Sequence, residues 1–172
     1  MVVVALVAAL AFTPTVKSAY VFVVSAMWAW IIGVGSYYLI PSLGPFHEAP
    51  QDFAGLTRTS IQATQERYLE QRAHLLAHPQ AGDAFAQISA FASLHCALTC
   101  LVWLAARYYG LRILSWVAFA FLVGTMLATV YLGWHFAVDD LVGIAIAWVA
   151  FQLGKLTVMG TTRIPARGTP TP

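Results

Sequence analysis

Long uncharged stretches alternate with short polar segments along this chain. Three runs contain no Asp, Glu, Lys or Arg, namely residues 18–47, 84–106 and 113–138. A helix needs about 20 apolar residues to cross the hydrocarbon core of a bilayer. The pattern therefore predicts four full membrane-spanning helices, at about 19–42, 86–107, 112–132 and 136–158.

Composition supports lipid as the solvent of this fold. The 172 residues are 60% hydrophobic and 9% charged, whereas about 25% of the residues in a soluble domain are charged. The mean hydropathy is +0.74 and the net charge is only +2. These values exclude an ordinary soluble globule, a disordered chain and a nucleic-acid-binding protein. We expect an all-α, polytopic transmembrane bundle, with one domain over 1–159 and a disordered cytoplasmic tail over 160–172.

Two further features of the apolar sequence bear on the fold. Residues 1–12 form a fifth apolar segment, too short to span, without the basic start of a signal peptide. We interpret it as the end of a partial helix, with an interfacial or re-entrant segment as the alternative. Cys96 and Cys100 lie four positions apart, which fits neither a disulfide framework nor a zinc finger, so we expect small buried residues.

The charges between the spans separate into two groups. One side carries only cations: Lys17, Arg107, Arg112, Lys155, Arg163 and Arg167. The other side carries the loop 43–85, where acids and arginines are mixed. The positive-inside rule places the cationic side in the cytoplasm, so this loop faces outward from a bacterial-type plasma membrane. Within it, residues 57–78 have helical spacing and predict an amphipathic helix on the membrane surface; a solvated connector is the alternative.

Ionisable residues near the outward ends of the spans are the candidates for function, because such groups are costly in a membrane. His95 lies in the second full span, and His135 lies where the third span gives way to the fourth. Asp139 follows His135 by four positions, so on a helix it can accept a hydrogen bond from the imidazole. That bond leaves the second ring nitrogen as a nucleophile or base. His95 is then a candidate acid for the leaving group.

These residues also carry a family resemblance. Ser93-Leu94-His95 resembles the Ser-x-His motif of the type-2 phosphatidic acid phosphatase superfamily, and the segment from His135 to Asp139 resembles its final His-x-x-x-Asp motif. The two motifs lie about 40 residues apart, on successive spans. The Pro-rich segment 38–45 resembles the branch related to inositol phosphorylceramide synthases. The chain departs from the family pattern at Thr129, where an Arg is usual, and it lacks a Lys-x6-Arg-Pro motif.

The resemblance implies a phosphoryl transfer that needs no metal or other cofactor. His135 attacks phosphorus and forms a phosphohistidine, Asp139 orients it, His95 protonates the leaving oxygen, and Ser93 donates a hydrogen bond to a phosphoryl oxygen. Such a transition state needs cationic or N–H donors. The cations on the outward side are Arg58, Arg67 and Arg72. Their alternative role is a solvated helix face.

The expected activity is that of a lipid-phosphate phosphatase or phosphotransferase, with a lipid phosphate in the bilayer as substrate and membrane lipids as partners. Two other functions stay open from sequence. His95, His135, Asp139 and Asp140 include zinc and iron ligand types, as in a metal-dependent hydrolase; alternatively, the protein is a non-catalytic scaffold or transport subunit. Neither the oligomeric state nor the acceptor, water or alcohol, follows from the sequence.

Overall fold

A computed structural model describes residues 11, 13–82 and 90–160 of the chain. The described part is helical and contains no strand. In chain order its elements are α2 (Val16–Leu39), α3 (Pro45–Glu48), η1 (Pro50–Phe53), α4 (Ser60–Ala77), α5 (Leu94–Tyr108), α6 (Arg112–Tyr131) and α7 (Ala137–Gly160). Residues 1–10, 12 and 161–172, which hold most of the expected partial helix and the tail, lie outside the description.

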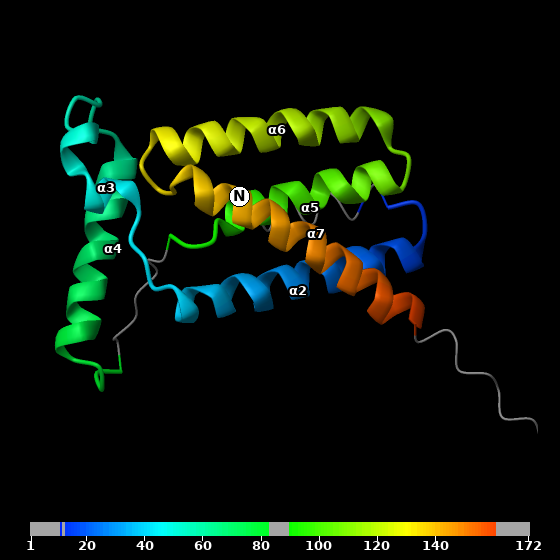
Figure 1. Cartoon of the computed structure of the whole chain (residues 1–172), viewed down its shortest axis with the longest axis horizontal. Coiled ribbons are helices and arrows are strands. Elements are labelled where there is room, and N and C mark those ends of the chain that lie inside the picture. The colour runs from blue at the N-terminus through cyan, green and yellow to red at the C-terminus, as the bar shows by residue number, and fades with distance from the viewer. Residues whose placement is uncertain (1–10, 12, 83–89, 161–172) are drawn as a thin grey trace, which may run out of the picture.

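Four helices form an up-and-down bundle. α2 packs along α7, and α5 packs against both α6 and α7. Consecutive long helices run in opposite directions, so α2 and α6 end where α5 and α7 begin (Figure 1). The crossing of α2 and α7 is close: a Cβ on Gly154 would overlap the side chain of Ser25. Small residues at such positions let helices approach when lipid provides no hydrophobic drive.

Local sequence signals set the helix ends. Thr15 caps α2 by accepting a hydrogen bond from the Ser18 N–H, at 3.1 Å, and α2 ends before Pro41, a residue that disfavours helix in the position before it. Gly110 and Gly133 have positive φ, at 72° and 74°. Only glycine adopts such angles without strain, so these two residues turn the chain before α6 and after it.

Among the described residues, three helices and not four are long and apolar enough to cross a membrane: α2, α6 and α7. The bundle therefore supports a membrane protein, but the expected fourth full span over 86–107 is not confirmed. α5 has 15 residues and begins at Leu94. It begins there because the Ser93 side chain caps its first turn, accepting from the Cys96 N–H at 3.4 Å. Residues 90–93 before it are not helical.

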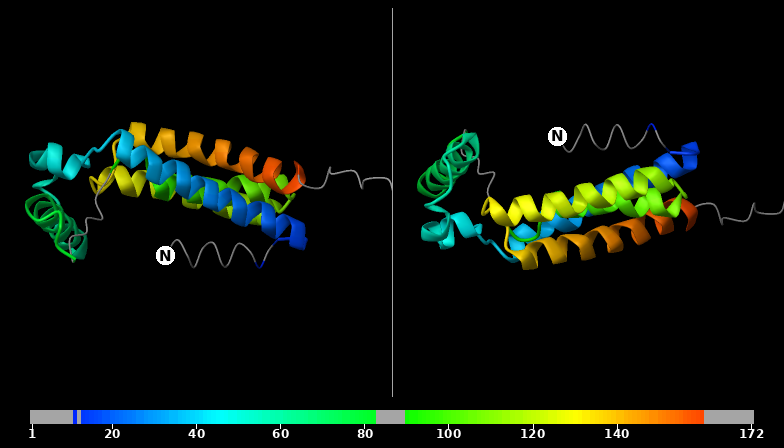
Figure 2. Two further views of the ribbon diagram at one scale, coloured as in Figure 1. Left: turned by 90° about the horizontal axis from the view of Figure 1, so that it is seen from below. Right: turned by 90° about the horizontal axis from the view of Figure 1, so that it is seen from above.

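The polar loop forms a separate layer across one end of the bundle. Figures 1 and 2 show α3, η1 and α4 at the end where α6 passes into α7. The expected helix over 57–78 is present as α4, capped by Thr59, whose backbone N–H in turn donates to Gln62 at 2.7 Å. Gln65, the buried residue of α4, donates a hydrogen bond to the Leu132 carbonyl oxygen at 2.8 Å. This bond fastens α4 to the end of the bundle.

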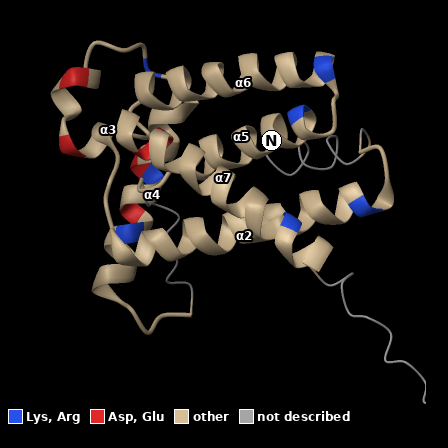
Figure 3. Ribbon diagram, turned by 45° about the vertical axis from the view of Figure 1, so that its right-hand side comes forward, with Lys and Arg blue, Asp and Glu red and all other residues tan. Residues whose placement is uncertain are grey.

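Charge divides between the two ends of the molecule. By the helix bounds, Lys17 is near the start of α2, Arg107 and Arg112 flank the turn between α5 and α6, and Lys155 is near the end of α7, all toward the end opposite α4. The described acidic residues gather, together with arginines, at the end that carries α3 and α4 (Figure 3). The separation expected from the sequence is therefore present in the described residues. It distinguishes two ends of the bundle and does not by itself assign either end to a compartment.

Candidate active site

His135 lies in the turn between α6 and α7, at the end of the bundle covered by the polar loop. Gly133 reverses the chain there, and the N–H groups of Trp134 and His135 both donate to the Thr129 carbonyl oxygen, at 2.9 and 3.2 Å. The turn is tightly packed against the loop. A Cβ on Gly44 would come within 2.5 Å of the Trp134 carbonyl oxygen, and the Phe46 N–H donates to the Gly133 carbonyl oxygen at 3.0 Å.

The imidazole of His135 is held by a backbone carbonyl. Its side chain is 5% exposed, and Nδ1 lies 2.8 Å from the carbonyl oxygen of Ala90. A carbonyl oxygen only accepts hydrogen bonds, so Nδ1 must carry the proton. The tautomer is thereby set, and Nε2 keeps an unprotonated lone pair. Such a nitrogen is suited to act as a nucleophile.

The carbonyl that holds His135 belongs to a firmly bonded segment, residues 90–93. The Ala90 N–H donates to the Ser42 carbonyl oxygen at 3.0 Å, the Ala92 N–H to Ser36 Oγ at 3.1 Å, and the Ser93 N–H to the carbonyl oxygen of Asp139 at 3.1 Å. In these bonds the backbone N–H groups of residues 90, 92 and 93 donate to distant acceptors and not to the carbonyl groups of a preceding helical turn. They explain why residues 90–93, which lie within the expected span 86–107, are not helical.

His95 faces His135 from the first turn of α5. The two ring centroids are 6.0 Å apart, and the ring planes make an angle of 57°. His95 is exposed whereas His135 is buried. The structure thus brings together the two histidines that the sequence places 40 positions apart. At this separation the two rings are within the range of direct aromatic contact.

Asp139 does not bond His135 as expected. Its carboxylate, 2% exposed, accepts a hydrogen bond from the Phe136 N–H at 2.8 Å, as an acid in the third position of a helix does for its cap. The expected bond required a helix that runs from residue 135 to 139, and α7 begins only at Ala137. Asp139 therefore fixes the backbone beside His135 while Ala90 holds the ring.

Ser93 lies immediately before the first residue of α5 and caps that helix, next to the site. The residue is fully buried, and besides capping α5 it packs against α7, where a Cβ on Gly143 would overlap the Ser93 carbonyl oxygen. The start of α5, where the first N–H groups of a helix have no partners within it, therefore lies beside the start of α7. Two helix N-termini meet near the histidine pair, an arrangement that favours anions.

A buried carboxylate next to Asp139 in the first turn of α7 was expected as a possible metal ligand. Asp140 is 1% exposed; one of its oxygens accepts from Cys96 Sγ and the other from Thr129 Oγ1, both at 3.0 Å. Cys96 was expected as a merely apolar residue, and Thr129 stands where the family pattern has Arg. The adjacent acids Asp139 and Asp140 are the only feature of the sequence that points to this network.

The three candidate arginines lie on or beside α4, and none has a hydrogen bond to a site histidine in the described part of the chain. Arg58 is paired with Glu66 on the exposed surface. The Arg67 guanidinium lies over the Tyr68 ring, 5.9 Å from its centroid, and Tyr68 in turn contacts Trp134, with 5.9 Å between centroids. Arg72 is partly buried. Arg67 is thus tied through two aromatic rings to the residue that precedes His135.

The environment of His135 disfavours its protonated form. Burial lowers the pKa of the imidazole, because a charged ring loses hydration in the interior. The hydrogen bond to Ala90 and the carboxylates of Asp140 and Asp139 act in the opposite direction and offset part of this effect. The net direction, a lowered pKa, favours the neutral ring that a nucleophile requires.

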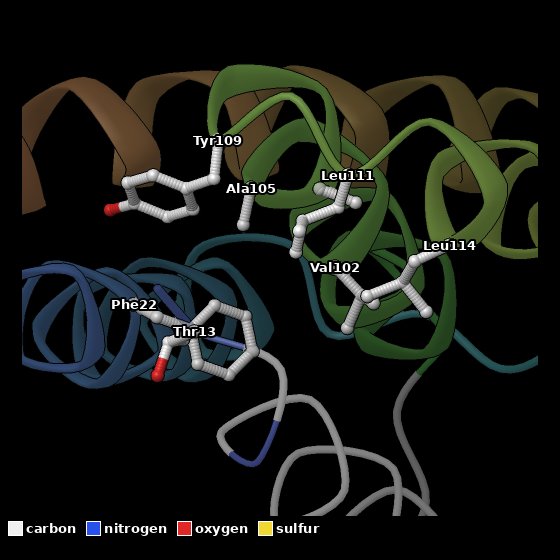
Figure 4. A pocket seen from close by; sticks show the side chains of 8 residues that line it. Thr13, Phe22, Val102, Ala105, Tyr109, Leu111 and Leu114 are labelled. Carbon is white, nitrogen blue, oxygen red and sulfur yellow. The ribbon is translucent and has the colours of Figure 1, made fainter. Parts of the chain in front are cut away.

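The described residues contain no group of three or more His, Cys, Asp or Glu side chains placed to hold a metal ion. A small apolar pocket lies at the other end of the bundle, lined by residues such as Phe22, Val102 and Leu114 (Figure 4). Its lining has no acid or histidine, so we assign the chemistry to the histidine end.

Comparison with known proteins agrees with this geometry. A family model described as the PAP2 superfamily matches residues 1–153. No curated protein sequence gives a significant match to the chain, and neither does any solved structure.

Proposed function

The chain belongs to the PAP2 superfamily, whose members are typically phosphoesterases, and on this basis we propose that it cleaves or transfers the phosphoryl group of a membrane lipid phosphate. Membership alone suggests phosphatase or phosphotransferase activity. The observation that carries the proposal further is the histidine pair, in which Nδ1 of His135 is held by Ala90 at 2.8 Å and the His95 ring lies 6.0 Å away.

In the proposed first step, Nε2 of His135 attacks phosphorus while the bond from phosphorus to the lipid oxygen breaks. The electron pair leaves with that oxygen, which takes a proton from His95. A phosphohistidine forms on His135. In the second step water or an alcohol attacks phosphorus, the N–P bond breaks, and the proton of the attacking hydroxyl returns to His95. Asp139 keeps the turn in place, and its negative charge favours the cationic ring.

Negative charge on the phosphoryl oxygens requires donors around them. We assign this role to the Ser93 hydroxyl and to Arg67 and Arg72, with Arg58 as the weaker candidate because Glu66 already pairs with it. α4 is fastened at the same end of the bundle through Gln65 and Leu132. We propose that the long arginine side chains extend from α4 to an anion bound at the histidines.

A lipid substrate is favoured by the position of the site. It lies at the end of a bundle whose helices expose large apolar side chains, such as Trp116 and Leu127 of α6, 74% and 68% exposed, and lipid covers such faces. A phosphate ester at the membrane surface has its head group at this depth and its chains beside the helices. With the cationic end in the cytoplasm, the site faces outward.

The test is phosphate release from a panel of lipid phosphates by the purified protein in detergent, with vanadate and EDTA added separately. We expect release that vanadate inhibits and EDTA does not. Replacing His135 by Ala should lower turnover at least about a thousandfold, whereas the exposed His47→Ala should match the wild type. EDTA-sensitive release would favour a metal-dependent hydrolase instead.

The acceptor is tested in the same preparation. If no phosphate is released, the assay is repeated with inositol and other alcohols, and the product lipid is analysed. Transfer to an alcohol supports the branch related to inositol phosphorylceramide synthases. Absence of both release and transfer, with no radiolabelled phosphohistidine trapped by denaturation, would contradict the proposal and favour a scaffold or transport protein.

A further inference from the structure

The buried carboxylate of Asp140 is the feature that the proposed mechanism does not use. It lies one residue beyond Asp139 in the first turn of α7, and it is 1% exposed. Its two oxygens accept from a thiol on α5 and a hydroxyl on α6, and no Lys or Arg pairs with it in the described residues. Burying an unpaired carboxylate is costly, and the helix N-terminus offsets that cost only in part.

Each of the two partners connects Asp140 to a histidine-bearing segment. Thr129 donates its hydroxyl to Asp140, and its carbonyl oxygen accepts the N–H of His135 at 3.2 Å. Cys96 donates its thiol to Asp140, directly follows His95, and bonds the cap residue Ser93 through its N–H at 3.4 Å. The carboxylate is thus the common acceptor of two short chains of bonds, one ending at each histidine.

Three oxygen atoms lie within hydrogen-bonding distance of the Thr129 hydroxyl. Its Oγ1 lies 2.9 Å from the Thr125 carbonyl oxygen and 3.0 Å from both the Met126 carbonyl oxygen and Asp140 Oδ2. One hydroxyl hydrogen serves one good bond, and a bond to an ionised carboxylate is roughly twice as strong as one to a neutral oxygen. The hydrogen therefore points to Asp140, which draws α6 to α7 at the level of the site.

We propose that Asp140 is a positioning residue that sets the separation of His95 and His135 by joining α5 and α6 to the start of α7 through Cys96 and Thr129. This inference rests on the proposed function for its effect on turnover, and on geometry alone for its effect on the histidine pair. The site thus has a second support besides the Ala90 carbonyl, and Thr129 donates a hydrogen bond to it at the position where the family pattern has an arginine.

The chain offers a matched control for each bond. Cys100 is a second buried thiol of α5, one turn beyond Cys96, and Thr125 is a second threonine of α6, whose hydroxyl donates to the Phe121 carbonyl oxygen at 2.8 Å. Cys96→Ala and Cys100→Ala remove the same atoms, as do Thr129→Val and Thr125→Val. Only the first member of each pair breaks a bond to Asp140.

The experiment measures turnover of phosphatidic acid in mixed micelles, or of whichever lipid phosphate the wild type cleaves. We expect Cys96→Ala and Thr129→Val each to lower kcat about three- to thirtyfold with KM within about twofold, and Cys100→Ala and Thr125→Val to leave both unchanged. Cys96→Ser keeps a donor to Asp140 and should recover most of kcat. Equal effects in a pair, or no recovery by serine, would overturn the positioning role.

A second measurement does not depend on turnover. The His135 imidazole is followed by NMR in the full-length protein with isotope-labelled histidine. Asp140→Asn should move its titration to lower pH, because the ring faces Asp140 and Asp139 from α7 and His95 from α5, and one of the two negative charges is lost. The control variants should leave the titration in place. If Asp140→Asn and Thr129→Val both leave the His135 signals unchanged, Asp140 does not position this ring, whatever the enzyme turns over.

Discussion

The tautomer of a single histidine determines what this site can do. The Ala90 carbonyl holds Nδ1 of His135, so in the proposed mechanism Nε2 can attack phosphorus only while the ring is neutral. Acid that protonates Nε2 removes the nucleophile, so activity falls as the pH drops through the pKa of His135.

Burial lowers the pKa of His135, which predicts where the acid limb lies. The kcat/KM for a lipid phosphate should remain high through pH about 6.5, the ordinary value for histidine, and decline only below it. The measurement is a pH profile of initial rates at low substrate concentration, with a return to neutral pH to confirm that the enzyme is intact. A reversible acid limb above the ordinary histidine value would contradict a neutral, buried nucleophile.

Asp139 provides a second prediction at this scale. Because its carboxylate caps the Phe136 N–H, Asp139→Ala should lower the free energy of unfolding by about 1 kcal/mol and turnover at least tenfold. Asp139→Asn keeps an oxygen that accepts the same bond, so it should unfold like the wild type and keep turnover within about tenfold. Thermal unfolding in detergent and initial rates check both. An asparagine variant as inactive as His135→Ala would mean that Asp139, and not Ala90, holds the imidazole during catalysis.

At the scale of elements, the contact between α5 and α7 fixes Ser93 and the first turn that carries His95. Gly143 makes this approach possible, because a Cβ there would overlap the Ser93 carbonyl oxygen and lie 3.3 Å from the Ala97 nitrogen. Gly143→Ala should therefore push α5 away from α7, lowering the free energy of unfolding by about 1–3 kcal/mol and turnover by more than tenfold.

Gly124 of α6 is the matched control for this prediction. No atom lies within 4 Å of a Cβ built there, and alanine is the better helix former by roughly 1 kcal/mol. Gly124→Ala should leave turnover unchanged and raise the unfolding temperature slightly. Thermal unfolding and initial rates of the two variants side by side are the measurement. Equal behaviour of the two variants would mean that the close approach at Ser93 is not required.

The elements show how far hydropathy predicts this fold. The runs at 112–132 and 136–158 became α6 and α7 within two residues at each end, because uncharged stretches of that length have one stable form in lipid. The full span expected over 86–107 is not confirmed: its described part is helical from Leu94, and residues 90–93 are not helical. Hydropathy does not distinguish a helix from an extended segment of small apolar residues, and the bonds of residues 90, 92 and 93 to distant partners leave no trace in the local sequence.

The same distinction explains which parts of the site were found. His95 and His135 came together because two helix ends at one side of a bundle must be neighbours. The hydrogen bond expected between Asp139 and His135 assumed that residues 135–139 are helical, but His135 lies in the turn before α7. The roles of the Ala90 carbonyl and the Cys96 thiol could not be predicted from the sequence. Every residue has a backbone carbonyl, and a cysteine in an apolar run is ordinarily a packing residue.

At the scale of the whole molecule, the two ends have different characters. Basic residues without acids lie toward one end, whereas the other end, with α4, carries acids together with arginines (Figure 3). The histidine pair lies at the α4 end, beside the turn between α6 and α7. Between the two ends the helices expose large apolar side chains. A molecule of this form lies across a bilayer with its two ends in different compartments, and the site belongs to one compartment only.

The positive-inside rule predicts the compartment of each end, and accessibility to a membrane-impermeant maleimide tests this prediction. Gly55 lies beside α4 and Gly160 ends α7, and a Cβ at either position meets no atom within 4 Å, so a cysteine at each disturbs nothing. We expect Gly55→Cys to react in intact cells and Gly160→Cys only after the membrane is opened. The wild-type chain, whose Cys96 and Cys100 are buried, provides the background. The reverse pattern would place the histidine pair in the cytoplasm, and the lipid phosphate would then have to come from the inner leaflet.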